Sequence, residues 1–278
     1  MMEVLSVLDP VKTNVVHVYE NLQQRGQTCL VFEKLDGNLD ELLSDGHNMP
    51  LSVSEIRPIA HQLLTTLEAL RGLGVIHCDL KPDNVMLVHH QNQPFRIKLI
   101  VCGLSLRTSE VRHGMVMQPL GYRAPEVSLG LPISGAIDLW GLLSLLYLSD
   151  DLFNIHCQYQ MMRSMVDVLG KPDDHLLNAG KYTRRFFKEK QPREISKWMN
   201  EEIQEPIEMI DQRAFVNLLK LLLQMDPELR ITAAEALQHL FVTMRHIDEE
   251  LDTSLYAYGA FNKVITCKTD DSKDDSVL

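Results

Sequence analysis

A carboxylate, an amine and a carboxamide lie within one short stretch that begins at Asp79, continues through Lys81 and ends at Asn84. Side chains of these types can accept a proton, neutralise an anionic group and coordinate a metal ion. The stretch follows His77 and lies between a long predicted helix and an apolar strand, and this context makes the spacing specific. The alternative, that Asp79 is an ordinary solvated loop carboxylate, does not account for the whole pattern.

The segment from Val75 to Leu87 resembles the catalytic loop of a eukaryotic protein kinase. In that family an Asp accepts the proton of the substrate hydroxyl, a Lys two residues later steadies the γ-phosphate, and an Asn three residues further on holds a metal ion. The resemblance therefore implies these roles for Asp79, Lys81 and Asn84. It also implies ATP and Mg²⁺ as cofactors.

The next motif of such a kinase is altered in this chain. Where kinases carry Asp-Phe-Gly after the following strand, the sequence reads Val101-Cys102-Gly103. The Asp of that motif ligates Mg²⁺ beside the transferred phosphate. Valine offers no oxygen to a hard cation, so Asn84 remains as a weak metal ligand by itself. We therefore expect the binding of ATP and Mg²⁺ to be impaired.

The phosphate-binding motifs of a kinase N-terminal lobe do not occur in this sequence. Neither Gly-x-Gly-x-x-Gly nor the strand lysine of Val-Ala-Ile-Lys precedes Phe32. The chain is expected to start inside the regulatory helix, where Glu3 is either a surface residue or the helix carboxylate without its partner. The predicted organisation is an N-lobe remnant over residues 1–32, a kinase C-lobe over 33–247, and an acidic, disordered tail over 248–278.

Three further features match residues that shape a kinase lobe and perform no chemistry. Tyr122-Arg123-Ala124-Pro125-Glu126 resembles the Ala-Pro-Glu segment, with the Tyr-Arg lead-in of the cyclin-dependent and dual-specificity kinases. Arg230 has the spacing of the arginine that pairs with that glutamate, which predicts a partly buried Glu126–Arg230 ion pair. Asp138 is expected to hold the backbone of the catalytic loop.

A closer resemblance, to the homeodomain-interacting protein kinases, covers most of the chain. It is carried by Thr28-Cys29-Leu30-Val31-Phe32-Glu33, Gly130-Leu131-Pro132, Ala136-Ile137-Asp138, Thr183-Arg184-Arg185-Phe186-Phe187 and Phe241-Val242-Thr243-Met244. Members of that family are dual-specificity or Ser/Thr kinases that act largely in the nucleus on transcriptional regulators. They lack the Arg before the catalytic Asp, so Cys78 is an expected departure. Val116 stands where the family has its activation-loop Tyr.

The same resemblance implies a nucleotide pocket where the two lobes of a kinase meet. Phe32 would be the gatekeeper, and Glu33 and Leu35 would form the hinge that meets adenine. Met86 would lie under the adenine ring. A plain β-strand and core packing explain these four residues equally well.

Composition limits the classes of partner. The 278 residues are 45% hydrophobic and 23% charged, as in an ordinary globular protein. The net charge of −11 argues against direct binding to nucleic acid or to an anionic membrane. Five scattered cysteines and no basic, apolar leader indicate a reduced intracellular protein, in the nucleus or the cytoplasm. The expected partners are proteins, either kinase substrates or transcriptional regulators.

The elements that must position these residues predict an α+β, protein-kinase-like fold, with a mostly helical C-lobe and only a remnant of the β-rich N-lobe. Strands are expected over 14–19, 28–32, 85–88 and 96–100, and helices over 55–73, 138–148, 159–169, 212–224 and 233–240. The end of a further helix is expected over 4–8. Capping boxes are predicted at Ser52 with Glu55 and at Thr232 with Glu235.

Three functions are compatible with these observations. The first is a catalytically impaired pseudokinase that binds or scaffolds protein partners of related Ser/Thr kinases. The second is an active, ATP-dependent Ser/Thr or dual-specificity kinase that acts on transcriptional regulators and whose N-lobe lies outside this sequence. The third is a decayed duplicate with little stable fold. The replacement at Val101 favours the first, because it lies well inside the chain.

Overall fold

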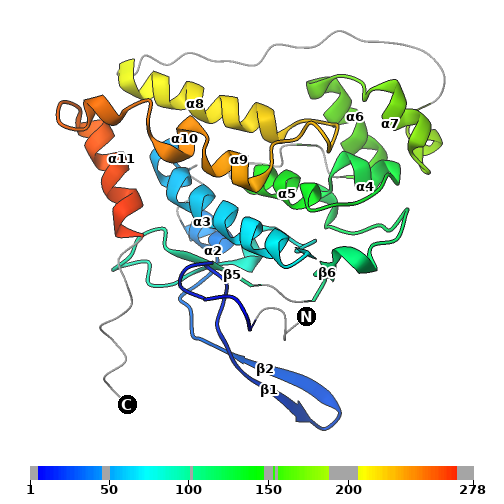
Figure 1. The fold of residues 1–278 in the computed structure, drawn as a ribbon, viewed down its shortest axis with the longest axis horizontal. Helices are drawn as coiled ribbons and strands as arrows, with labels where there is room; N and C mark the ends of the chain where they lie inside the picture. The colour runs from blue at the N-terminus through cyan, green and yellow to red at the C-terminus, as the bar shows by residue number, and fades with distance from the viewer. Residues whose placement is uncertain are drawn as a thin grey trace.

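The computed structural model describes residues 6–45, 51–100, 103–146, 153, 156–187 and 206–267. The helices are α2 (Leu39–Asp45), α3 (Val53–Gly72), α4 (Pro125–Leu129), α5 (Ala136–Leu146), α6 (Gln158–Leu169), α7 (Asp174–Ala179), α8 (Pro206–Leu222), α9 (Ala233–Leu237), α10 (Leu240–Thr243) and α11 (Leu255–Thr266). The strands are β1 (Val18–Gln24), β2 (Gln27–Phe32), β3 (Val75–Ile76), β4 (Val85–Leu87), β5 (Ile97–Leu99) and β6 (Leu106–Arg107). Short 3₁₀ turns include η1 (Pro82–Asn84). The helices form one body, and the β1–β2 hairpin projects from it (Figure 1).

Helix α3 is the central element of the helical body (Figure 1). The carboxylate of Glu55 accepts the backbone N–H of Ser52 at 2.9 Å, so the predicted capping box is present. Ile59 and Leu63 on one face of α3 are fully buried, as their helical spacing predicts. That face packs on α5, α8 and α9, and it carries the larger of the buried apolar clusters.

The strand pairs confirm most of the predicted β-structure. Strands β4 and β5 are antiparallel, with Val85 opposite Leu99. The first two strands, β1 and β2, also pair with each other, from Val18 opposite Phe32 to Gln24 opposite Gln27. The first strand was predicted over 14–19 and instead starts at Val18. Residue Val15 forms a separate parallel bridge to Leu99 that ties the N-terminal segment to β5.

A second apolar cluster is formed by side chains of β3, α4, α5 and α6. Trp140 of α5 is fully buried and stacks on Phe153, with 5.8 Å between the ring centroids. Met161 and Met165 of α6 pack into the same cluster. Because α5 is apolar nearly all round, it contributes to this cluster and to the one around α3.

The C-terminal part of the chain corrects one prediction. Residues 248–278 were expected to form a disordered tail, but Leu255–Thr266 form helix α11, which packs on α3. Ser254 begins this helix by accepting the N–H of Ala257 at 3.3 Å. Residues 268–278 lie outside the described part of the chain. Helix α9 is shorter than predicted and ends at Leu237.

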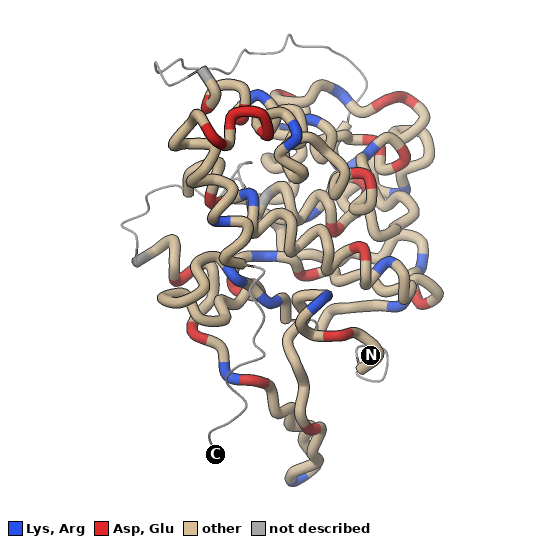
Figure 2. The backbone as a smooth tube through the Cα atoms, turned by 60° about the vertical axis from the view of Figure 1, so that its left-hand side comes forward, with Lys and Arg blue, Asp and Glu red and all other residues tan. Residues whose placement is uncertain are grey.

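One prediction at the N-terminus falls partly on residues that are not described. Residues 4 and 5 of the helix end expected over 4–8 are outside the described ranges, and residues 6–8 lie in a turn. Within the described ranges, no helix is both long enough and apolar enough to cross a membrane. Figure 2 shows basic and acidic positions interspersed over the helical body.

Candidate functional site

The loop from β3 to β4 is anchored on a buried carboxylate of α5. Asp138 accepts the backbone N–H of His77 at 2.7 Å and that of Cys78 at 2.9 Å. Burial raises the pKa of Asp138, although the two amide hydrogen bonds that it accepts oppose this effect. Cys78 has a φ of 66°, in the left-handed region that non-glycine residues rarely adopt. The sequence-based expectation that Asp138 holds this loop is therefore confirmed.

The imidazole of His77 links the same loop to the end of β5. Its Nε2 lies 2.9 Å from the carbonyl oxygen of Ile100, and its Nδ1 accepts the backbone N–H of Asp79 at 3.3 Å. Since Nδ1 is used as an acceptor, Nε2 is assigned the proton that it donates to Ile100. The ring thus bridges the backbone of Asp79 and that of Ile100, the residue that precedes position 101.

The structure brings two of the three predicted catalytic residues into direct contact. The side-chain nitrogen of Asn84 donates to the Asp79 carbonyl oxygen at 2.7 Å and to Asp79 Oδ2 at 2.8 Å. Lys81 lies between them in sequence, and its Nζ is 3.9 Å from Asp83 Oδ2. Asp79, Lys81 and Asn84 are all half-buried. A carboxylate and an amine are therefore present at one partly open surface, and their catalytic roles remain predictions.

Among the described residues, the oxygen donors that magnesium needs do not gather at this site. The Asn84 carboxamide directs its nitrogen to Asp79, so only its Oδ1 could meet a cation. The Ile100 N–H donates to the Asn84 carbonyl at 2.9 Å, and Val101 follows directly. Val101 and Cys102 lie outside the described residues, but a valine side chain contains no oxygen wherever it points. The donor set of Asn84 with Val101 does not suit Mg²⁺.

The four residues expected at a nucleotide pocket lie near β2 and β4. Phe32 ends β2, Met86 is the middle residue of β4, and both are half-buried, as is Leu35. The carboxylate of Glu33 is occupied, because its Oε2 is 2.5 Å from Lys98 Nζ. The structure leaves both interpretations of these residues open, as adenine contacts or as packing.

Lys98 itself was missed at the sequence level. It is 3% exposed, and its Cα partner across β4–β5 is Met86. The second oxygen of Glu33, Oε1, accepts the backbone N–H of His17 at 2.5 Å. A lysine within the apolar run of β5 was the available signal, because a buried ammonium group requires a partner.

The predicted ion pair between the Ala-Pro-Glu segment and Arg230 is present. Arg230 donates to both oxygens of Glu126, at 2.6 and 2.9 Å, and both side chains are fully buried. The pair is therefore more buried than expected. The guanidinium of Arg230 also lies 5.1 Å from the ring centroid of Trp140. Nearby, burial lowers the pKa of Arg123, which donates to the carbonyl oxygen of Gln118 at 2.9 Å.

A second buried charge centre was not predicted. The carboxylate of Asp211 on α8 receives hydrogen bonds from Arg57 of α3, from His246 Nε2 at 2.8 Å and from the Tyr256 hydroxyl at 2.6 Å. Arg57 also donates to the Phe241 carbonyl oxygen at 2.8 Å. The only sequence signal was an arginine on the apolar face of α3, because the partners come from four distant segments.

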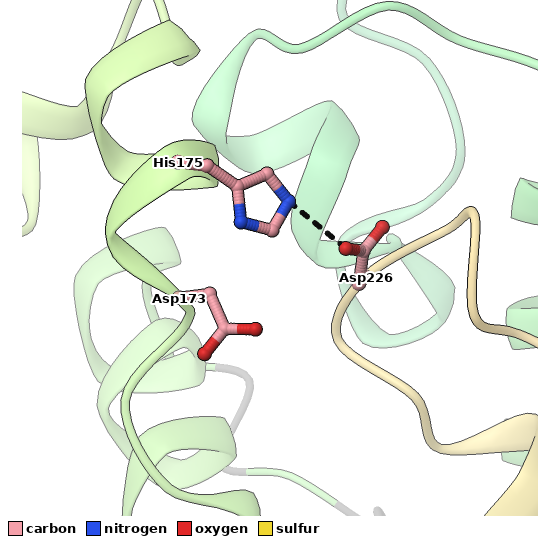
Figure 3. Close-up of side chains that lie close together, drawn as sticks. All are labelled: Asp173, His175 and Asp226. Atoms are coloured by element: carbon pink, nitrogen blue, oxygen red, sulfur yellow. Dashed lines mark hydrogen bonds and ion pairs between the residues drawn. The ribbon is translucent and has the colours of Figure 1, made fainter.

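A further cluster joins α7 to the turn before α9. Asp173, His175 and Asp226 each bring one ligand-type atom within 4.8 Å of the others (Figure 3). His175 Nε2 is 2.9 Å from Asp226 Oδ2, and Asp226 Oδ1 accepts the N–H of Glu228 at 2.9 Å. Both oxygens of Asp226 already have protein partners, and the other two residues are exposed. The geometry is explained by an ion pair and a turn without a metal ion.

Comparison with known proteins identifies the family. The family described as "Protein kinase domain" matches residues 2–242. The chain belongs to the protein kinase family. This confirms both the family resemblance and the kinase-like α+β fold. As a class, protein kinases depend on ATP and Mg²⁺.

Homeodomain-interacting protein kinases are among the curated proteins that resemble this chain. The chain is 35% identical to homeodomain-interacting protein kinase 2 of Mesocricetus auratus, over 92% of this chain and 25% of that protein. It is 33% identical to homeodomain-interacting protein kinase 1 of Caenorhabditis elegans, over 92% of this chain and 36% of that protein. The value for homeodomain-interacting protein kinase 4 of Homo sapiens is 30%, over 90% of this chain and 48% of that protein. The chain thus spans between a quarter and a half of the length of these relatives.

Proposed function

We propose that this kinase-like domain works by binding protein partners of related Ser/Thr kinases and does not transfer phosphate efficiently. The observation that carries the proposal is the donor set at the metal position. Asn84 directs its amide nitrogen to Asp79, and the next position after β5 and Ile100 is a valine. Removing a metal carboxylate withdraws several kcal/mol of transition-state stabilisation, on the order of a 10³-fold loss in rate.

The scaffold of the catalytic loop supports a binding role. Asp138 fixes the backbone of His77 and Cys78, and the Glu126–Arg230 pair fixes the segment that follows the activation loop. These contacts organise a surface on which a protein segment can dock, independently of phosphate transfer. The domain would then compete with a related kinase for its substrates or transcriptional regulators. We propose the nucleus or the cytoplasm as the location.

The nucleotide side of this proposal is tested by calorimetric titration of the full chain with ATP, with and without Mg²⁺. A Val101→Asp variant is the matched comparison, because it restores one carboxylate beside Asn84. We expect no magnesium-dependent binding by the native chain and a gain of magnesium dependence in the variant. Magnesium-dependent binding of micromolar strength by the native chain would contradict the proposal.

The binding side is tested by adding the full chain to homeodomain-interacting protein kinase 2 and a protein substrate of that kinase. We expect phosphorylation of the substrate to fall as the chain is added, and we expect the Asp79→Asn variant to inhibit equally. If the chain does not inhibit phosphorylation even at concentrations well above that of the kinase, it does not compete with the kinase for this substrate.

An alternative function is a working Ser/Thr or dual-specificity kinase that uses ATP and acts on transcriptional regulators. The observation that favours it is the retained contact of Asp79 with Asn84, with Lys81 close by. A phosphotransfer assay decides between the two. Transfer by the native chain that disappears in Asp79→Asn would establish the alternative.

A further inference from the structure

A hollow beside α3 is lined by basic, neutral polar and apolar side chains. Its volume is about 250 Å³, and it lies between the N-terminal segment 9–14, α3, Arg96 and α11. Lys12, His61 and Arg96 contribute to its lining, together with the apolar side chains of Pro58 and Val264. No aspartate or glutamate is among the described residues that line it.

Arg96 is a buried cation whose hydrogen bonds within the described part of the chain all go to neutral carbonyl groups. The residue is 6% exposed. One terminal nitrogen donates to the Cys267 carbonyl oxygen at 2.5 Å and the other to the Val11 carbonyl oxygen at 3.2 Å. Its Nε is buried and has no hydrogen-bond acceptor among the described residues. A guanidinium held away from water without a carboxylate is costly, because its charge is only partly compensated.

The neighbouring polar groups of the same wall are satisfied. The Gln62 carboxamide donates to the carbonyl oxygens of Pro58 and Phe95 at 2.9 and 2.8 Å and accepts the Ile97 N–H at 3.0 Å. The Asn14 side chain donates to the Gln62 carbonyl oxygen at 3.3 Å. Among the described residues of this wall, the positive charge of Arg96 therefore has no negatively charged partner.

We propose that this cavity binds a small carboxylate that carries a short apolar body. The carboxylate would face Arg96 and Lys12, the arginine and the lysine of the lining. Its apolar part would lie against Pro58 and Val264. Arginine suits this role because its planar fork matches a carboxylate. The site is separate from the catalytic loop, so it does not depend on the function proposed above.

The probe is hexanoate, titrated into the isotopically labelled full chain and followed by NMR. We expect saturable shifts of the Gln62 and Thr65 amide signals, and much smaller shifts with hexanol, which has the same chain without the charge. Inorganic phosphate, which lacks the apolar part, is expected to bind more weakly than hexanoate. Equal effects of hexanoate and hexanol, or no saturable shift with hexanoate, would overturn the proposal.

Two variants locate the binding. Lys12→Met removes an exposed cation at the opening and is expected to weaken hexanoate binding about three- to fivefold. Arg163→Met is the matched control, because Arg163 is an exposed cation on α6 whose pair with Asp167, at 3.7 Å, resembles that of Lys12 with Asp9, at 3.6 Å. Arg96→Lys keeps the charge but loses the fork, and it is expected to weaken binding further. Unchanged affinity in Lys12→Met, or an equal loss in Arg163→Met, would refute the assignment.

Discussion

Glu126 and Arg230 form a two-bond ion pair that is completely closed to solvent, although 104 residues separate them in the chain. The arginine makes further bonds to the carbonyl oxygens of Gln224 and Ala136. The charges of the Glu126 carboxylate and the Arg230 guanidinium therefore neutralise each other inside a region of low dielectric constant. The pair joins the start of α4 to the segment before α9, and so it fixes the platform beneath the catalytic loop.

The first prediction is that Glu126→Gln lowers the free energy of unfolding by about 3–5 kcal/mol. The loss is large because the substitution leaves the Arg230 guanidinium buried without its counter-charge. Urea unfolding followed by circular dichroism measures the change. Asp174→Asn is the control, because Asp174 forms an exposed pair with Lys171 and is expected to change stability by less than about 1 kcal/mol. Equal effects of the two substitutions would show that burial of the Glu126 pair contributes little.

The second prediction concerns the anchor of the catalytic loop. Asp138→Asn replaces one of the two acceptor oxygens by an NH₂ group that faces a backbone N–H. We expect a loss of about 2–3 kcal/mol of stability and faster hydrogen exchange at the amides of His77 and Cys78. Native-state exchange read by NMR tests this, with the amides of α3 as an internal reference. Unchanged protection at His77 and Cys78 would mean that the loop holds its shape without Asp138.

Local and repeating patterns predicted much of this fold. The helical spacing of Ile59 and Leu63 predicted α3, and Ser52 with Glu55 predicted its start, because both signals depend on neighbours within a few residues. The Glu126–Arg230 pair was predictable only because the resemblance to kinases supplied a contact that spacing alone does not give.

Long-range charge placement could not be predicted in the same way. Arg57 and Asp211 are 154 residues apart, and nothing local marks either as the partner of the other. Helix α11 was missed because its buried side is made of small residues such as Ala257 and Ala260, whereas Leu255 and Tyr258 face solvent. The apolar pattern of the segment is therefore weak, and an acidic sequence follows it.

The third prediction concerns the hydrogen bond from Tyr256 to Asp211. Tyr256→Phe removes a donor to a buried carboxylate and is expected to lower stability at pH 7 by about 1–2 kcal/mol. Tyr258→Phe on the same helix is the matched control, because Tyr258 is exposed. Urea unfolding at pH 7 compares the two variants. A loss confined to Tyr258→Phe, or no loss in either variant, would contradict the prediction.

The fourth prediction follows from the pKa of Asp211. Burial opposes ionisation, but the hydrogen bond from His246 and the charge of Arg57 hold the pKa of Asp211 below its ordinary value of 3.8. A carboxyl with a lowered folded-state pKa stabilises the fold above its ordinary pKa, and this contribution is lost as the pH falls through the folded-state value. The difference between native chain and Tyr256→Phe should therefore shrink below about pH 4. Urea unfolding curves recorded from pH 7 to pH 3 measure this difference in stability. A difference that grows as the pH falls would contradict a lowered pKa of Asp211 in the folded protein.

The fifth prediction separates two cysteines by reactivity. Burial raises the pKa of Cys78 to about 12, and the charge of Asp138 adds to the effect. Only the thiolate attacks an alkylating reagent, so at pH 8 Cys78 should react at least about 100-fold more slowly than the exposed Cys157. Iodoacetamide labelling in native buffer, followed by peptide mass spectrometry, gives both rates. In concentrated urea the two rates should converge, because unfolding restores solvent and an ordinary pKa to Cys78. Native rates within a few-fold of each other would mean that the catalytic loop opens readily, and that Asp138 does not hold it closed.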